Sequence, residues 1–226
     1  MSLHLLYLYA QSAGQVVHVW LGQGGTASKY LSGWSPGNYV GLEADTPKRA
    51  ALVAAFRHAW RAYERDAMGA DEYRPISHQG SNLTEAGGIG IGYTVVDAPH
   101  TMLFMGLDAE YRRARHWIEH RLTFERDANL NTFETTIRVL GGLLSAYHHS
   151  GGDSVFLKRA RDLADRMSTV FDTPSGLPFP MVNLQRREGG WGQQRSQGLV
   201  STAEASTWQL LFRYLSELTD EDVFTG

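Results

Sequence analysis

The chain has 226 residues, of which 42% are hydrophobic and 20% are charged, as is typical of one globular domain or part of a larger one. Its formal net charge of −3 gives no indication of nucleic acid as a partner. The absence of cysteine from the sequence excludes disulfides and thiolate zinc sites within this chain, and leaves both secreted and cytosolic origins open.

The N-terminal segment, residues 1–45, follows no helical or strand pattern that we recognise. Residues 1–28 contain no Asp, Glu, Lys or Arg, and residues 21–45 are rich in Gly, Ser and Tyr. No run is apolar enough and long enough to predict a transmembrane helix. A signal peptide would begin with positive charge, which is missing here. We expect an irregular segment, and whether it anchors the chain to a membrane stays open.

Helical patterns follow one another from residue 46 onward. Thr46 is the expected N-cap of the first helix, with Pro47 at its first helical position. The long polar and glycine-containing stretch 70–92 comes next, and a loop of this length is more often functional than idle. Asp97 is expected to cap the following helix, since Pro99 is tolerated only in the first turn.

Four further helices are expected to open at Asp108, Asn131, Asp153 and Ser201. The turns at residues 106–111, 151–156 and 218–224 form a weak sequence repeat. Each joins the end of one helix to an acidic cap and an aromatic residue in the next helix. Short polar turns between amphipathic helices predict antiparallel αα-hairpins. Repeated hairpins indicate a solenoid or a closed α/α toroid. Residues 178–184 could form a short strand.

The helix that begins at Asn131 carries two different stripes at helical spacing. One stripe is apolar and is expected to face the core: Phe133, Ile137, Leu140, Leu144 and Tyr147. The second stripe is polar or small: Glu134, Arg138, Gly141, Ser145 and His148. Small residues leave room and the two charges can hold a polar ligand, so the second stripe predicts the wall of a cavity.

An ordinary structural explanation of the same residues remains open. The sequence Asn131-Thr132-Phe133-Glu134 also fits a capping box, in which Glu134 would bond back to the backbone of Asn131. Glu134 and Arg138 at i,i+4 could likewise be a surface ion pair. The sequence Ser201-Thr202-Ala203-Glu204 leaves the same choice between a capping box and a ligand-binding carboxylate.

Five segments, in this order, resemble glycoside hydrolase family 47, the class I α-1,2-mannosidases. They are Ala55–Trp60 followed by Tyr63, Asp71–Ser77, Asn131–Leu144, Thr173–Pro178, and Ser201–Thr207. The resemblance covers residues 50–224 and is closest to the enzymes of the endoplasmic reticulum. It implies an all-α fold in which residues 46–226 are antiparallel αα-hairpins forming an incomplete arc of an (α/α)7 toroid.

The resemblance also implies a reaction, the inverting removal of terminal α-1,2-linked mannose from high-mannose N-glycans. Glu134 matches the position of the catalytic acid, and Arg138 and Glu204 match residues that line the sugar pocket. Calcium is the expected cofactor, at the base of the central cavity. Its threonine ligand and the other catalytic carboxylates would lie beyond Gly226, so no metal ligand is assigned here. We therefore expect the chain alone to be inactive and to bind calcium weakly or not at all.

The resemblance further implies high-mannose glycoproteins as partners. It also implies a secretory location, the endoplasmic reticulum or Golgi. The glycosylation sequon Asn82-Leu83-Thr84 agrees with that location. One departure is His100, which replaces the second aspartate of the family's Asp-Ala-Leu-Asp-Thr in residues 97–101. Two alternatives to an enzyme remain: a non-catalytic mannose-binding module of glycoprotein quality control, and a helical-repeat interaction scaffold.

Overall fold

The computed structural model describes residues 10–12, 15–17, 45–84, 88–191 and 199–221. The chain divides into two compact units, Met1–Leu52 and Val53–Gly226. In the first unit, β1 (Ala10–Ser12) and β2 (Gln15–Val17) pair antiparallel. Most of the segment 1–45, which was expected to be irregular, lies outside the described residues.

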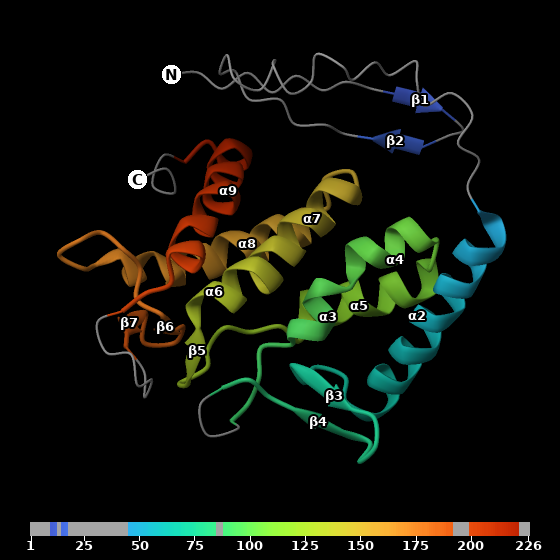
Figure 1. Cartoon of the computed structure of the whole chain (residues 1–226), viewed down its shortest axis with the longest axis horizontal. Coiled ribbons are helices and arrows are strands. Elements are labelled where there is room, and N and C mark those ends of the chain that lie inside the picture. Colours follow the sequence, from blue (N-terminus) through green and yellow to red (C-terminus); the bar gives the residue numbers. More distant parts are fainter. Residues whose placement is uncertain (1–9, 13–14, 18–44, 85–87, 192–198, 222–226) are drawn as a thin grey trace. The chain divides into compact units, whose positions relative to one another are not determined.

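The second unit is built mainly of helices, and its short strands gather at one end of them (Figure 1). The helices are α2 (Thr46–Asp66), which begins in the first unit, α3 (Tyr93–Asp97), α4 (Pro99–Met105), α5 (Asp108–His120), α6 (Thr132–Glu134), η3 (Thr135–Leu140), α7 (Gly141–His149), α8 (Ser154–Met167), η4 (Ser168–Phe171) and α9 (Thr202–Thr219). The strands are β3 (Glu72–Arg74), β4 (Gln79–Ser81), β5 (Asn129–Asn131), β6 (Met181–Asn183) and β7 (Glu188–Gly190). Strands β3 and β4 form a hairpin, and β5, β6 and β7 form an antiparallel sheet in that order. The strand predicted within residues 178–184 is confirmed as β6, whereas the hairpin within the long polar loop was not foreseen.

Three of the predicted helix caps are confirmed by side-chain hydrogen bonds. Asn131 accepts from the backbone N–H of Glu134 at 2.8 Å, and Asp153 accepts from that of Val155 at 3.1 Å. Ser201 accepts from the backbone N–H three residues ahead at 3.4 Å. Each bond satisfies a backbone donor that the first turn of a helix would otherwise leave unpaired.

Three cap predictions were wrong. Asp108 is the first residue of α5 and not its cap, because the position before it is Leu107, which offers no side-chain cap. The carboxylate of Asp45, not the hydroxyl of Thr46, accepts from the backbone N–H of Lys48 at 3.1 Å at the start of α2. Asp97 is the last residue of α3, and α4 follows after Ala98 without a side-chain cap. The physical reason is that the chain is already helical before Pro99, so Asp97 belongs to α3 and its carboxylate does not cap α4.

The segments α6, η3 and α7 run without a break from Thr132 to His149, and η3 is a π-helix inside this long helix. The residues that face the core differ in part from the predicted apolar stripe. Leu140 and Leu144 are buried as predicted, but Phe133 and Ile137 are only half-buried. Five residues of a neighbouring stripe are fully buried instead: Thr135, Thr136, Val139, Leu143 and Ala146. A π-turn within an α-helix is often found at a functional site.

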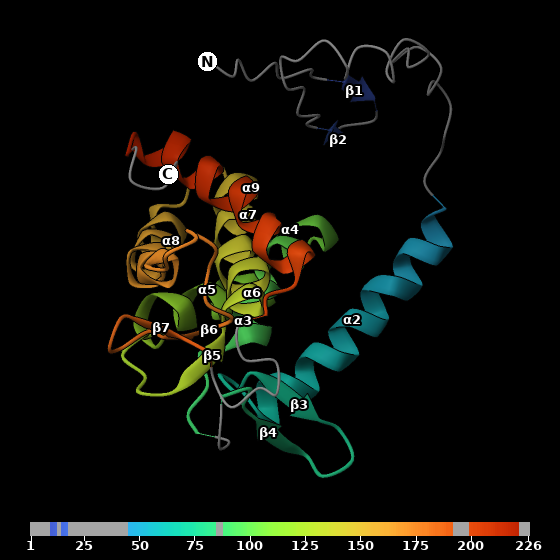
Figure 2. The same ribbon diagram turned by 60° about the vertical axis from the view of Figure 1, so that its left-hand side comes forward.

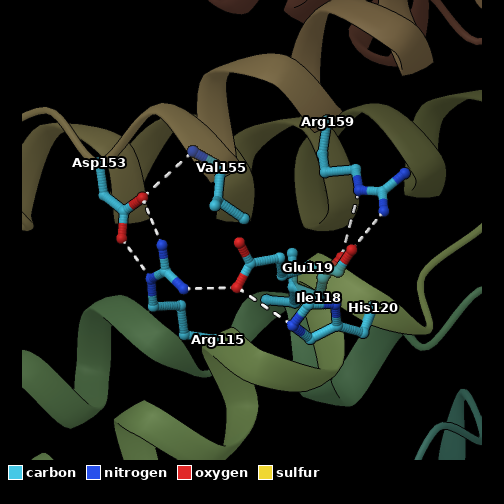
Figure 3. A network of polar contacts seen from close by, with 7 residues as sticks. All are labelled: Arg115, Ile118, Glu119, His120, Asp153, Val155 and Arg159. Carbon is cyan, nitrogen blue, oxygen red and sulfur yellow. Dashed lines mark hydrogen bonds and ion pairs between the residues drawn. The ribbon is translucent and has the colours of Figure 1, made fainter.

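Helices α5 and α8 are joined by a network of polar contacts (Figure 3). The guanidinium of Arg115 donates to both carboxylate oxygens of Asp153, at 2.5 and 3.1 Å, and to Glu119 at 2.8 Å. Arg159 on α8 donates to two backbone carbonyls in the last turn of α5, at 3.2 and 2.7 Å. Asp153, the cap of α8, is thereby bonded to a side chain of α5, which fixes the relative position of the two helices.

Replacing Arg115 with methionine is expected to lower the free energy of unfolding at pH 7 by about 1 kcal/mol. The hydrogen bonds from Arg115 hold the pKa of Asp153 below its usual range. Because that pKa is lower in the folded than in the unfolded chain, the stabilisation is present above about pH 4 and is lost as pH falls through the folded pKa. Urea unfolding of the parent chain and of the Arg115→Met variant should show a smaller difference in the free energy of unfolding at pH 3 than at pH 7. Arg112→Met on the exposed side of α5 is the control, and an equal effect of Arg115→Met at both pH values would contradict the prediction.

Candidate active site

A polar pocket of about 500 Å³ is lined by residues of the segment from β3 to α3, of the end of β5, and of α6 and η3. The ribbons of α3, α6 and β3 can be followed in Figure 2. The residues that line the pocket are Asp71, Glu72, Leu83, Tyr93, Thr94, Asp97, Asn131, Glu134 and Arg138. Four carboxyl groups and one guanidinium therefore share one hollow. Such a concentration of ionisable groups around a cavity is characteristic of binding and catalytic sites.

Glu134 lies in the first turn of the long helix, where Asn131 caps its backbone N–H. Its carboxylate accepts a hydrogen bond from Nε of Arg138 at 2.5 Å, and its side chain is 37% exposed. The ion pair that the i,i+4 spacing allowed is therefore present, and both of its partners line the pocket. The structure thus brings two of the predicted site residues together and leaves Glu134 open to the hollow.

Asp97 is the residue of the pocket to which sequence reasoning gave the wrong role. Burial raises the pKa of its carboxyl group, while the charges of His100 and Arg138 act in the opposite direction. The preceding residues Val95 and Val96 are completely buried. A Cβ on Gly142 would lie 2.8 Å from the carbonyl oxygen of Val96, so only glycine lets the end of α3 approach α7 this closely. A carboxylate directly after two buried valines was the signal that could have identified it.

Asp71 is almost fully buried and holds the loop that leads into α3. Its Oδ1 accepts from the backbone N–H groups of Ile91, Gly92 and Tyr93, at 2.8, 2.8 and 3.3 Å. Its Oδ2 accepts from the backbone N–H of Leu83 at 2.9 Å. Four donors converge on one carboxylate, so Asp71 positions one wall of the pocket rather than offering a free charge to a ligand.

Tyr93 connects that wall to the long helix. Its hydroxyl lies 2.7 Å from Oγ1 of Thr135, the residue after Glu134. Burial raises the pKa of Tyr93 well above its usual range, so its hydroxyl is neutral at physiological pH. The contact fixes the start of η3, and with it Glu134, against α3.

Other residues of the predicted cavity stripe do not line the pocket. A Cβ on Gly141 would lie 3.5 Å from Leu211, and Nδ1 of His148 lies 2.7 Å from the hydroxyl of Tyr214, so both face α9. Glu204 is in the first turn of α9, which contacts α6, but it is not among the lining residues. Its role in binding a sugar stays a prediction. His100 also lies outside the lining and packs edge-on near Phe104.

A second and larger hollow, of about 610 Å³, lies between α2 and the β3–β4 hairpin. Its lining is basic and apolar: Ala54, Arg57, His58, Arg61, Ala62, Arg65, Tyr73, Pro75 and His78. None of its described lining residues is a carboxylate, whereas the glycoside hydrolysis that the resemblance implies requires two carboxyl groups. The smaller pocket with Glu134 is therefore the better candidate for catalysis.

The residues that the structure describes do not by themselves fit a calcium site. Within the described ranges, no group of three or more His, Asp or Glu residues is placed to hold a metal ion. The buried carboxylate of Asp71 in the pocket is already occupied by four backbone donors. Calcium requires six to eight oxygen ligands, and the described residues do not offer such a set.

Comparison with known proteins places these residues in a family context. The profile of Glycosyl hydrolase family 47 matches residues 55–226. The endoplasmic reticulum mannosyl-oligosaccharide 1,2-alpha-mannosidase of Schizosaccharomyces pombe is 41% identical over 193 residues, which cover 85% of this chain. The human protein of the same name is 41% identical over 78% of this chain.

A solved structure, the alpha-1,2-mannosidase from Trichoderma reesei, matches with a TM-score of 0.68 and 29% identity over 79% of this chain. This likeness confirms the predicted class of helical-hairpin fold. The chain spans 36% of the S. pombe protein, 24% of the human protein and 38% of the Trichoderma chain. The polar pocket therefore lies in a chain that corresponds to only about a quarter to two fifths of the length of these relatives.

Proposed function

The chain belongs to glycosyl hydrolase family 47, and on that premise we propose that it forms the part of an α-1,2-mannosidase that carries the catalytic acid. The complete enzyme would remove terminal α-1,2-linked mannose from high-mannose N-glycans with inversion of configuration. The observation that carries the proposal is the position of the Glu134 carboxylate, which opens onto a polar pocket and is held there by Arg138. The relatives named above, mannosyl-oligosaccharide 1,2-alpha-mannosidases, support the choice of substrate.

In the proposed reaction, Glu134 donates a proton, directly or through water, to the oxygen that leaves the anomeric carbon. The glycosidic C–O bond breaks while a water oxygen bonds to the opposite face of that carbon, and a second carboxylate accepts the proton of that water. An inverting enzyme keeps the two carboxyl groups about 6.5–9.5 Å apart so that the water fits between them. We assign the second carboxylate to a part of the enzyme outside this chain.

Arg138 and Asp97 are proposed to bind the sugar rather than to transfer the proton. Arg138 is already bonded to Glu134 through Nε, and its other N–H groups can donate to hydroxyl oxygens of the ring. Burial raises the pKa of Asp97, so this carboxyl group holds its proton to a higher pH than an exposed aspartate. It can therefore accept from a mannose hydroxyl when ionised and donate to one when protonated. Glu204 is proposed as a third sugar ligand on the family resemblance alone.

The cellular setting of the proposed enzyme follows from the same relatives. The names of two of them include the endoplasmic reticulum, which supports a secretory location and glycoprotein partners for this chain. Calcium remains a proposal for the complete enzyme. Among the helices that the structure describes, none is long and apolar enough to cross a membrane.

The purified chain alone is expected to release no measurable mannose from a high-mannose glycan. The reason is that the residues described here supply the acid and part of a sugar pocket, while the proposed base lies elsewhere. The measurement is chromatography of the glycan after incubation, with and without calcium. The comparison is this chain joined to the C-terminal part of the S. pombe relative, which should trim the glycan.

Turnover by the isolated chain would contradict the assignment of the base. Glycan binding by both proteins, with turnover by neither, would favour the mannose-binding module instead. A helical scaffold would show no dependence on mannose in any binding measurement.

A further inference from the structure

The sequon triplet Asn82–Thr84 directly follows β4, and the side-chain amide of Asn82 makes two contacts within the chain. Its Oδ1 accepts from the backbone N–H of Asp71 at 3.1 Å. Its Nδ2 donates to the carbonyl oxygen of Gly88 at 2.7 Å. Both functional ends of the amide are therefore used to hold two segments of the chain together.

The rest of the triplet is equally committed to the fold. The backbone N–H of Leu83 donates to Oδ2 of Asp71 at 2.9 Å. Thr84 is 6% exposed, and its hydroxyl oxygen is buried. All three positions that a glycosylating enzyme must recognise in an extended acceptor are thus bonded or covered.

Gly90 shows how closely these groups are packed. A Cβ on Gly90 would lie 2.4 Å from Oδ1 of Asn82 and 2.5 Å from Oδ1 of Asp71. The two side chains therefore lie directly against this glycine, and little space remains for a displaced arrangement. We use the word clasp for Asp71, Asn82 and their backbone partners at Leu83, Gly88 and Ile91–Tyr93.

We propose that Asn82 serves as a positioning residue in this clasp and that its sequon is consequently closed to N-glycosylation in the folded chain. Transfer of a glycan requires Nδ2 to attack the anomeric carbon of a lipid-linked donor, with loss of a proton from Nδ2 and departure of the lipid diphosphate. That attack needs Nδ2 turned away from Gly88 and the hydroxyl of Thr84 brought out to the enzyme. Both changes require the clasp to open.

The clasp matters to the molecule because it builds the pocket that contains Glu134. Asp71, Leu83 and Tyr93 belong to the clasp and also line that pocket. An opened clasp would therefore displace one wall of the candidate active site. This inference stands on contacts alone and does not depend on the proposed hydrolysis, so either can fail without the other.

The test uses the full chain produced in a host without N-glycosylation, then incubated with purified oligosaccharyltransferase and a lipid-linked oligosaccharide. Asn82-Leu83-Thr84 is the sole sequon of the 226 residues, so any added glycan mass reports on Asn82. A synthetic peptide of residues 78–88 is the unfolded reference. The folded chain is expected to be modified at least about tenfold more slowly than the peptide, and similar rates would overturn the proposal.

A matched control places an open triplet in the same hairpin. The substitution Pro75→Asn completes a second sequon with Ile76 and Ser77 in an exposed turn, where Ile76 is 97% exposed. Peptide mapping should find glycan at position 75 and not at Asn82 of the same molecule. If position 75 is closed as well, slow modification is a property of the whole folded chain, and the assignment to the clasp is overturned.

A second variant opens the clasp without removing the acceptor. Asp71→Asn keeps the size of the side chain but weakens its hold on four backbone N–H groups. Under conditions where circular dichroism shows that this variant is still folded, glycosylation of Asn82 should rise several-fold, and hydrogen exchange of residues 83 and 91–93 should quicken. An unchanged rate of modification, together with faster exchange, would show that the clasp does not protect the sequon.

Discussion

Replacing Asp71 with alanine should lower the free energy of unfolding by about 3–5 kcal/mol, one of the largest effects expected of any single substitution in this chain. Four backbone N–H groups, those of Leu83 and Ile91–Tyr93, would lose their acceptor at once. Asp71 is 1% exposed, so water cannot replace the carboxylate without a local rearrangement. Each unsatisfied buried donor costs about 1–3 kcal/mol, and partial entry of water reduces the sum. Urea unfolding followed by circular dichroism measures the change.

Glu72→Ala is the matched control for this substitution. Glu72 is the next residue, carries the same charge and lines the same pocket, but it is exposed and accepts only a long hydrogen bond of 3.3 Å from Ser81. Its loss should change stability by less than about 0.5 kcal/mol. Comparable effects of the two substitutions would show that the backbone donors around Asp71 are satisfied in some other way.

The sequence predicted those parts of the fold that depend on local patterns. The caps at Asn131 and Asp153 followed from their side chains, because a short oxygen acceptor reaches the second or third backbone N–H of the helix that it precedes. The pairing of Glu134 with Arg138 followed from i,i+4 spacing in the same way. These interactions involve residues close in sequence, so periodicity is sufficient to find them.

The remaining parts of the site depend on contacts between distant residues, which no local pattern can report. Asp71 finds its partners at Ile91, Gly92 and Tyr93, about 20 residues further along the chain. The approach of α3 to α7 at Gly142, next to Asp97, is likewise a contact between distant residues. The buried stripe of the long helix begins with Thr135 and Thr136 and continues through Val139, Leu143 and Ala146, and an apolar periodicity of 3.6 does not select the two threonines.

Replacing Glu134 with glutamine in an enzyme completed with the C-terminal part of the S. pombe relative should lower kcat about 10²–10⁴-fold, the usual contribution of a general acid. Glutamine keeps the length of the side chain and can still accept from Nε of Arg138, but it cannot give a proton to the leaving oxygen. Binding of an uncleaved high-mannose glycan should change by less than about threefold. Initial rates of mannose release and titration of the immobilised glycan are the two measurements.

The control for this substitution is Glu72→Gln, which removes a charge from the same pocket without touching the proposed acid. It should leave kcat within about twofold of the parent, because Glu72 has no assigned part in proton transfer.

An aryl mannoside with a good leaving group distinguishes a role of Glu134 in proton transfer from a role in holding the shape of the pocket. Its departing oxygen needs little protonation, so Glu134→Gln should impair its hydrolysis far less than that of the natural glycan. Equal losses on both substrates would mean that Glu134 holds the pocket in shape, with Arg138, and that the acid must be sought on another side chain.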